Sequence, residues 1–162
     1  MTDGILILAQ IALTGSLAGW MITGVADNWR YPDLNVEAVA MVTRFDLMAA
    51  QYPVEFDRVK HRRIDDPGKI MLLFRLIVAW ETLAAVVLTA GTFLLIGAGL
   101  GLAEPAFARA VAALGVTAFV MNWAGFLIGG NYFCYWYGHF PSQSTHLMLA
   151  IWGTLTLILL CL

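Results

Sequence analysis

Charged side chains are scarce in this sequence, and their scarcity excludes most soluble folds. Asp, Glu, Lys and Arg make up 12% of the 162 residues, whereas hydrophobic residues make up 60%. A soluble domain averages about 25% charged and about 45–50% apolar residues, and a soluble chain of this size could not bury the excess. The net charge of −2 also leaves no basic field to attract nucleic acid. We therefore expect a membrane protein that does not bind nucleic acid.

Cysteine and histidine are just as sparse. Cys134 and Cys161 are too few and too far apart for a disulfide framework or a CxxC metal knuckle, so we interpret both as small apolar residues. His61, His139 and His146 lie outside the deep part of any apolar run, which argues against intrinsic haem. No metal-ligand cluster or catalytic nucleophile motif stands out. We predict no catalytic residues, no metal site and no intrinsic cofactor; we expect bound lipid, with a quinone headgroup at His139 or His146 as an alternative.

Four long apolar runs dominate the chain. They cover about residues 4–26, 70–97, 106–128 and 146–162, close to or above the roughly 20 residues that cross about 30 Å of hydrocarbon. We interpret the first run as a retained span, because no Lys or Arg precedes it and it is too long for the core of a signal peptide. The sequence thus predicts an all-α, polytopic membrane protein with four transmembrane helices in a single domain, residues 1–162.

Residues 27–69 form the one long polar segment, which we expect outside the membrane. Apolar residues recur at helical spacing from Leu34 to Ala49, which predicts an amphipathic helix on the membrane surface or capping the bundle. The remainder, from Glu55 to Asp66, is expected to be mostly solvated.

Four spans place the two loops, 27–69 and 129–145, on one membrane face and both termini on the other. Seven of the nine basic residues lie within 27–69. The positive-inside rule therefore predicts that the loops face the cytoplasm. We expect the chain in the inner (cytoplasmic) membrane of a bacterium.

Glu81 lies deep in the second apolar run, where an acidic side chain costs about 2.5–3.5 kcal/mol on insertion scales. Asn122 lies at a similar depth from the same face, so we predict that its amide holds the Glu81 carboxyl, whereas Gln10 starts from the opposite face. We interpret Arg75 as an interfacial anchor, because six residues place it about 240° around the helix from Glu81. The Glu81–Asn122 pair is either an interhelical contact, which we favour, or a proton or ligand site.

Small residues form a stripe on two of the predicted helices and permit close helix packing. One stripe contains Ala12, Gly15, Ser16, Gly19 and Thr23, and the other contains Ala106, Ala110, Ala113 and Thr117. Both remain open to two interpretations, packing inside the bundle or docking of a partner subunit.

Polar and aromatic motifs along the chain match those of a known family. Asn28, Asn35 and Asp46 keep a spacing of seven and then eleven residues after the first helix, and Glu81 supplies an acid in the second. A later motif comprises Gly129, Gly130, Asn131, Phe133 and Trp136. In these features the chain resembles a bacterial family of predicted small integral membrane proteins without an assigned function. The resemblance implies a four-helix membrane fold and no reaction. The chain departs from the family pattern at Asn131, which replaces the family's usual acid. The basic N-terminus of that family implies the opposite membrane orientation, with the N-terminus in the cytoplasm.

Three functions are compatible with these features. We favour an accessory or scaffolding subunit that packs against a larger respiratory, photosynthetic or transport complex. The alternative is a small-solute or proton-coupled transporter that uses Glu81, although no inverted repeat is evident. The third is a quinone-binding redox subunit in which the aromatic residues of 129–145 line a pocket. The expected partners are membrane lipid and other integral membrane subunits or further copies of this chain.

Overall fold

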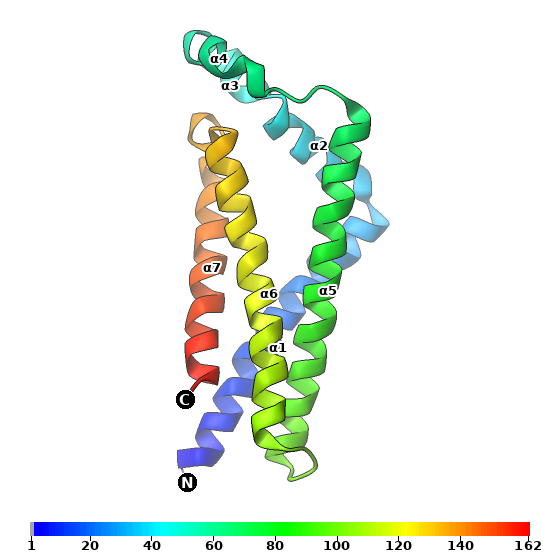
Figure 1. The fold of residues 1–162 in the computed structure, drawn as a ribbon, viewed down its shortest axis with the longest axis vertical. Coiled ribbons are helices and arrows are strands. Elements are labelled where there is room, and N and C mark those ends of the chain that lie inside the picture. Colours follow the sequence, from blue (N-terminus) through cyan, green and yellow to red (C-terminus); the bar gives the residue numbers. More distant parts are fainter. Residues whose placement is uncertain (1) are drawn as a thin grey trace.

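Four long helices form a bundle that short helices close at one end (Figure 1). The computed structural model describes residues 2–162, with side chains from residue 4 onward. The long helices are α1 (Thr2–Arg30), α5 (Pro67–Gly99), α6 (Pro105–Tyr132) and α7 (Phe140–Leu160). Each is long and apolar enough to cross a membrane, and residues 2–162 contain no strand. The predicted fold class, an all-α membrane protein with four spans, is confirmed.

The short helices form a cap over one end of the bundle. The cap, residues 32–62, consists of α2 (Pro32–Thr43), α3 (Asp46–Gln51), α4 (Pro53–Val59) and the 3-10 turn η1 (Lys60–Arg62). It lies at the same end as the α6–α7 connection, which contains the 3-10 turn η2 (Tyr135–Tyr137). Both termini and the α5–α6 turn lie at the opposite end (Figure 1).

Two of the long helices begin at the same local signal, an acidic N-cap followed by proline. The Asp66 carboxylate accepts hydrogen bonds from the backbone N–H groups of Gly68 and Lys69, at 2.8 and 3.2 Å. The Glu104 carboxylate does the same at the start of α6. Proline then follows in the first turn, where its missing N–H costs nothing and its fixed φ angle suits the helix. These backbone hydrogen bonds also lower the pKa of Glu104.

The structure corrects the boundaries around the α6–α7 connection. The helix α6 continues to Tyr132 instead of ending at residue 128, and α7 starts at Phe140 instead of His146. Gly129 and Gly130 therefore lie inside a helix, where Gly130 permits close packing: a Cβ atom there would lie 2.8 Å from the Tyr135 ring. The connection shortens from 129–145 to 133–139, and the fourth span is an ordinary helix of 21 residues. The other spans also extend past their predicted ends, because α1 reaches Arg30 and α5 covers Pro67–Gly99.

The predicted amphipathic helix over 34–49 is wrong as a single element. The backbone of Phe45 adopts a left-handed conformation, with φ of 58°, and this residue separates α2 from α3. Such a conformation is unfavourable for a bulky residue. It is compensated here by burial, because the Phe45 ring is 2% exposed and packs against Phe56 and Phe133. The following residues, expected to be mostly solvated, form α4 and η1, and none of residues 55–66 is buried.

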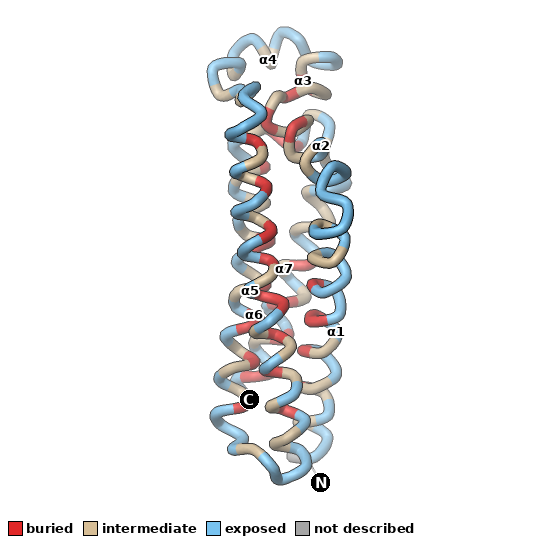
Figure 2. The backbone as a smooth tube through the Cα atoms, turned by 90° about the vertical axis from the view of Figure 1, so that its right-hand side faces the viewer, coloured by how far each residue is buried: buried red, intermediate tan, exposed pale blue. Residues whose placement is uncertain are grey.

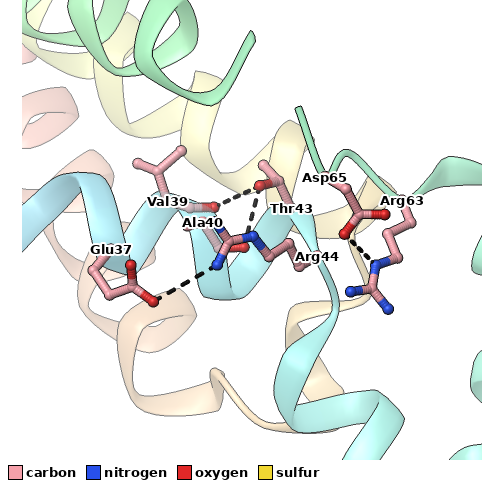
Figure 3. A network of polar contacts seen from close by, with 7 residues as sticks. All are labelled: Glu37, Val39, Ala40, Thr43, Arg44, Arg63 and Asp65. Atoms are coloured by element: carbon pink, nitrogen blue, oxygen red, sulfur yellow. Dashed lines mark hydrogen bonds and ion pairs between the residues drawn. The ribbon is translucent and has the colours of Figure 1, made fainter. Parts of the chain in front are cut away.

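A backbone hydrogen bond ties the cap to the segment that leads into α5, and further polar contacts lie within each of the two (Figure 3). The Thr43 hydroxyl donates to the carbonyl oxygens of Val39 and Ala40 within α2, while the Thr43 carbonyl accepts from the backbone N–H of Ile64 at 3.0 Å. Ion pairs join Arg44 to Glu37 and Arg63 to Asp65. Such exposed ion pairs contribute little, about 0–1 kcal/mol each, so buried aromatic contacts hold the cap more firmly.

The closest helix packing is between α5 and α6, where glycine lets the two backbones approach. A Cβ atom at Gly91 would lie 2.6 Å from the Ala112 Cα atom, and one at Gly115 would lie 2.8 Å from the Leu88 backbone nitrogen. Figure 2 shows that buried residues line the inward faces of the long helices, while exposed positions cover their outer faces. A membrane can cover those outer faces.

Most of the predicted small-residue stripes face outward. Ala12, Ser16, Gly19 and Thr23 of α1 are exposed, and so are Ala106, Ala110 and Thr117 of α6. Only Gly15 and Ala113 are half-buried members, with a Cβ atom at Gly15 placed 3.4 Å from the Thr92 methyl group.

Candidate ligand site

Glu81 on α5 is the centre of a hydrogen-bonded group that is buried at Glu81 and Asn122, half-buried at Asn28 and exposed at Asn35. Its carboxyl accepts from Asn28 Nδ2 of α1 at 2.7 Å through Oε2, and from Asn122 Nδ2 of α6 at 3.4 Å through Oε1. Asn35 Nδ2 of α2 in turn donates to Asn28 Oδ1 at 2.5 Å. We call these four residues the polar cluster. It joins three long helices and the cap at one point.

The corner between α1 and α2 makes this cluster. At Tyr31 the backbone leaves the helical conformation, with φ of −132° and ψ of 58°, and Pro32 starts α2 in a new direction. Asn28 lies on the last turn before the corner and Asn35 on the first turn after it. The two residues are seven positions apart in sequence, and the change of direction at the corner lets their side chains meet beside Glu81.

The structure brings together some of the predicted site residues and separates others. Asn122 contacts Glu81, as counting along the helices had suggested, but the shorter hydrogen bond comes from Asn28. Arg75 is exposed on α5 and forms no ion pair with any described residue. Gln10 lies about 27 Å from Asn28 along α1, where its amide donates to the Leu159 carbonyl at 2.9 Å. It belongs to the other end of the bundle.

A cavity of about 370 Å³ adjoins the polar cluster beneath α2. Its polar lining residues come from α1, α2, α5, the α6–α7 connection and α7: Asn28, Asn35, Glu81, Tyr135, His139, Ser142 and His146. The His146 ring stacks on Phe126 at 4.7 Å and on Trp123 at 5.5 Å between ring centroids, each pair inclined by 25°. Within the described part of the chain, Trp123 Nε1 and His146 Nδ1 are buried without a hydrogen-bond partner. One wall of the cavity is therefore aromatic and carries polar atoms without partners.

A second cavity of about 450 Å³ continues from the first along α5 and α6. The two share lining residues Val39, Val42, Ile77, Phe126 and Tyr135. Apart from Asn122, Thr43 and the Tyr135 hydroxyl, the second cavity is lined by apolar side chains and glycine. Together the cavities form a space that is polar at Glu81 and apolar along the α5–α6 groove.

Two titratable side chains of the α6–α7 connection face the polar cavity. Burial raises the pKa of Tyr135. Burial also lowers the pKa of His139, although the Asp46 carboxylate opposes that shift. His139 is therefore neutral at pH 7. Among residues 4–162, whose side chains the structure describes, no group of three His, Cys, Asp or Glu side chains is arranged to hold a metal ion.

The remaining family-matched residues divide between cavity and surface. Gly129, Gly130 and Phe133 line the apolar cavity, whereas Asn131 and Trp136 are exposed. The cavity residues that sequence reasoning did not single out include Trp123, Phe126 and Val39, whereas Tyr135 was covered only by the expectation that aromatic residues of 129–145 line a pocket. The first two carried no signal, because an aromatic residue in an apolar run is ordinary, and Tyr135 was one of several aromatics in the connection.

The match between the chain and a known family covers almost its whole length. A family described as "Predicted small integral membrane protein (DUF2165)" matches residues 6–162. The chain belongs to this family. No curated protein and no solved structure matches it. The DUF2165 description agrees with the four apolar helices and names no reaction.

Proposed function

We propose that this chain is a membrane-embedded binding protein for a small amphipathic molecule. The polar end of the ligand would meet the polar cluster, and its apolar end would lie in the α5–α6 groove. The observation that carries this proposal is the pair of adjoining cavities, about 370 and 450 Å³, with a buried carboxyl at one end and an apolar lining at the other. Ligand sites are commonly concave, about 300–1,000 Å³, and mostly apolar with a few placed polar groups.

A purely structural role for Glu81 explains less of what is observed. An interhelical contact requires a hydrogen bond between helices but no cavity beside it. Glu81 instead lies at a cavity wall together with polar atoms that lack partners, Trp123 Nε1 and His146 Nδ1. An ionisable residue within a membrane span is by default a functional-site candidate. The cavity favours ligand binding over a packing role.

The core beneath the polar cluster supports binding rather than free passage of a solute. Leu17, Leu88, Val116 and Phe119 are fully buried, and they form an apolar layer between the cluster and the end of the bundle at Gln10. A polar solute at Glu81 would meet this layer before it reached the other end. Transport would require the layer to open, whereas binding requires no rearrangement.

The experiment that tests the proposal fills the apolar cavity and leaves the polar cluster unchanged. Gly125 lines that cavity, and no atom lies within 4 Å of a Cβ atom at this position. Gly125→Phe should therefore occupy ligand space without disturbing helix packing. Gly24→Phe is the matched control, because Gly24 is equally open but lines neither cavity.

The probe is a diazirine-bearing dodecyl alcohol, which is amphipathic and uncharged, added to the protein in lipid nanodiscs. We expect Gly125→Phe to lower photolabelling about tenfold, the factor that corresponds to a loss of about 1.4 kcal/mol, while Gly24→Phe labels like the wild type. Equal labelling of all three proteins would reject the proposal. Without a ligand, acyl chains of membrane lipid would occupy the groove.

A second candidate function is that of an accessory subunit, supported by the exposed stripe on α1. Gly19 is exposed and has no atom within 4 Å of a Cβ position, so a partner helix could approach the backbone there. Affinity isolation after gentle solubilisation, with mass spectrometry, tests this. A partner lost from Gly19→Leu and retained by Gly24→Leu would support docking at the stripe, and identical recovery from both would reject it.

The cap carries the charge that supports an orientation. Lys and Arg are concentrated in residues 27–69, next to the ends of α1 and α5. By the positive-inside rule we propose that the cap faces the cytoplasm and that both termini face the opposite side of a bacterial cytoplasmic membrane.

A further inference from the structure

We infer that the molecule bound beside Glu81 carries a positive charge on an organic ammonium group, either an amine or a quaternary ammonium. This inference rests on the proposed ligand site and names the chemical class of its ligand. Three observations lead to it: the charge balance of the cavities, the hydrogen bonds of Glu81 and the aromatic residues that line the same cavity.

The charge balance comes first. Glu81 is the only Asp, Glu, Lys or Arg among the described residues that line either cavity. None of the ion pairs found among the described side chains includes it. Its oxygens receive hydrogen bonds only from neutral amides, those of Asn28 and Asn122. A buried carboxylate without a cation is costly, and a cationic ligand would supply the missing charge.

The aromatic lining supports the same ligand class. Phe74, Trp123, Phe126 and Tyr135 line the cavity that contains Glu81. The faces of such rings attract ammonium groups through their quadrupoles, and aromatic cages bind quaternary ammonium in this way. An anionic headgroup would meet a carboxyl and no Lys or Arg, so the lining disfavours it.

A neutral carbonyl headgroup, such as that of a quinone, is the main competitor. Trp123 Nε1 could donate to such an oxygen, and His146 Nδ1 could do so as well. A carbonyl oxygen is an acceptor only, so it could bind Glu81 only while that carboxyl carries a proton, whereas an ammonium group pairs with the carboxylate. The ammonium class accounts for Glu81 and for the aromatic wall, and the quinone becomes an outcome of the test.

Binding of a cation is also expected to release a proton from the site. If the empty site holds a proton on Glu81, the incoming ammonium replaces it: the carboxyl O–H bond breaks, the proton leaves to buffer and the carboxylate pairs with the ligand. Three other titratable groups face the same cavity, Tyr135, His139 and His146, and a protonated histidine would also repel a cation. Lower pH therefore weakens binding through either route, and only a substitution at Glu81 separates them.

The test compares two probes of the same shape and different charge. Benzyltrimethylammonium and its uncharged carbon isostere, neopentylbenzene, are titrated calorimetrically into the protein in nanodiscs at pH 7.5, with empty nanodiscs as the blank. We expect the cation to bind at least about tenfold more tightly than the isostere. Repeating the titration in buffers of different ionisation enthalpy measures the protons released.

Glu81→Gln keeps the side-chain shape and removes the charge, so it should abolish the preference for the cation. Glu104→Gln is the matched control, an exposed acid at the other end of the bundle, and should change nothing. Equal affinity for the two probes in the wild type would overturn the inference even if Glu81→Gln failed to fold. So would an unchanged preference in Glu81→Gln.

These outcomes remain distinct from failure of the proposed function. If the uncharged dodecyl alcohol still labels the cavity while the two probes bind equally, a ligand site exists and its ligand is not a cation. Decylubiquinone that binds more tightly than benzyltrimethylammonium, without sensitivity to Glu81→Gln, would assign a neutral carbonyl headgroup. If the alcohol also fails to label the cavity, the proposed function itself is rejected.

Discussion

Gly115→Ala tests the packing that supports the site, because Gly115 lies where α6 is closest to α5. The added Cβ atom would lie 2.8 Å from the Leu88 nitrogen, 2.9 Å from the Leu88 Cα atom and 3.0 Å from the Val87 carbonyl carbon. All three are backbone atoms, so no side chain can turn away. Comfortable contacts between carbon atoms are about 3.5–4.0 Å, so the helices would have to separate by roughly 1 Å. We expect a loss of about 1–3 kcal/mol of unfolding free energy, the usual cost of overpacking.

The assay is reversible unfolding in mixed micelles titrated with sodium dodecyl sulfate and followed by circular dichroism. Gly125→Ala is the control, because it makes the same change on the same helix with no atom within 4 Å. It should be no less stable than the wild type. Equal stability of the two variants would contradict the close contact between α5 and α6.

Three further predictions concern the polar cluster, the connection and the orientation. Glu81→Leu should lower the unfolding free energy by about 1–3 kcal/mol, because two asparagine amides lose their acceptor, and Glu81→Gln should lower it less; equal losses would argue against these hydrogen bonds. Burial lowers the pKa of His139 below 6.5, so below pH 6.5 the unfolded chain binds more protons than the folded chain. The unfolding free energy should therefore fall as the pH drops below 6.5. His139→Gln should flatten that dependence in pH-resolved unfolding curves. An impermeant maleimide applied from outside intact cells should label the exposed Cys161 and spare a cysteine introduced at Glu55 in the cap; the reverse pattern would invert the proposed orientation.

Hydropathy and helix geometry made the spans and one site contact predictable. Each apolar run is long enough to be recognised as a membrane span. The number of spans, four, then determines which loops lie at the same end of the bundle. The proximity of Glu81 and Asn122 followed from depth alone, because a helix advances by a constant 1.5 Å per residue. Regular elements permit this kind of counting.

The parts that could not be predicted depend on breaks in regular structure. The hydrogen bond between Asn28 and Glu81 joins residues 53 positions apart and depends on the direction in which the chain turns at Tyr31. The left-handed conformation of Phe45 contradicts local preference and follows only from its burial. His146 was placed at a helix end; because α7 starts six residues earlier, it lies inside the helix and stacks on Trp123.

The small-residue stripes show the limit of motif reading in a different way. GxxxG at Gly15 and Gly19 is the recognisable pattern, yet Gly19 faces outward. The glycines that bring helices together, Gly91 and Gly115, lie in no such motif. Which glycine is used depends on which faces meet, and composition does not determine that.

The central claim, that the space beside Glu81 is a ligand site, is tested most directly by locating the photolabel on the chain. The protein in nanodiscs is irradiated with the diazirine-bearing alcohol, digested and sequenced by tandem mass spectrometry. Our account predicts adducts on half-buried residues that line the two cavities, such as Val39, Val42 and Phe126. Adducts confined to outward-facing residues of the spans, such as Leu83 and Leu155, would show that the probe samples only lipid and would contradict the claim.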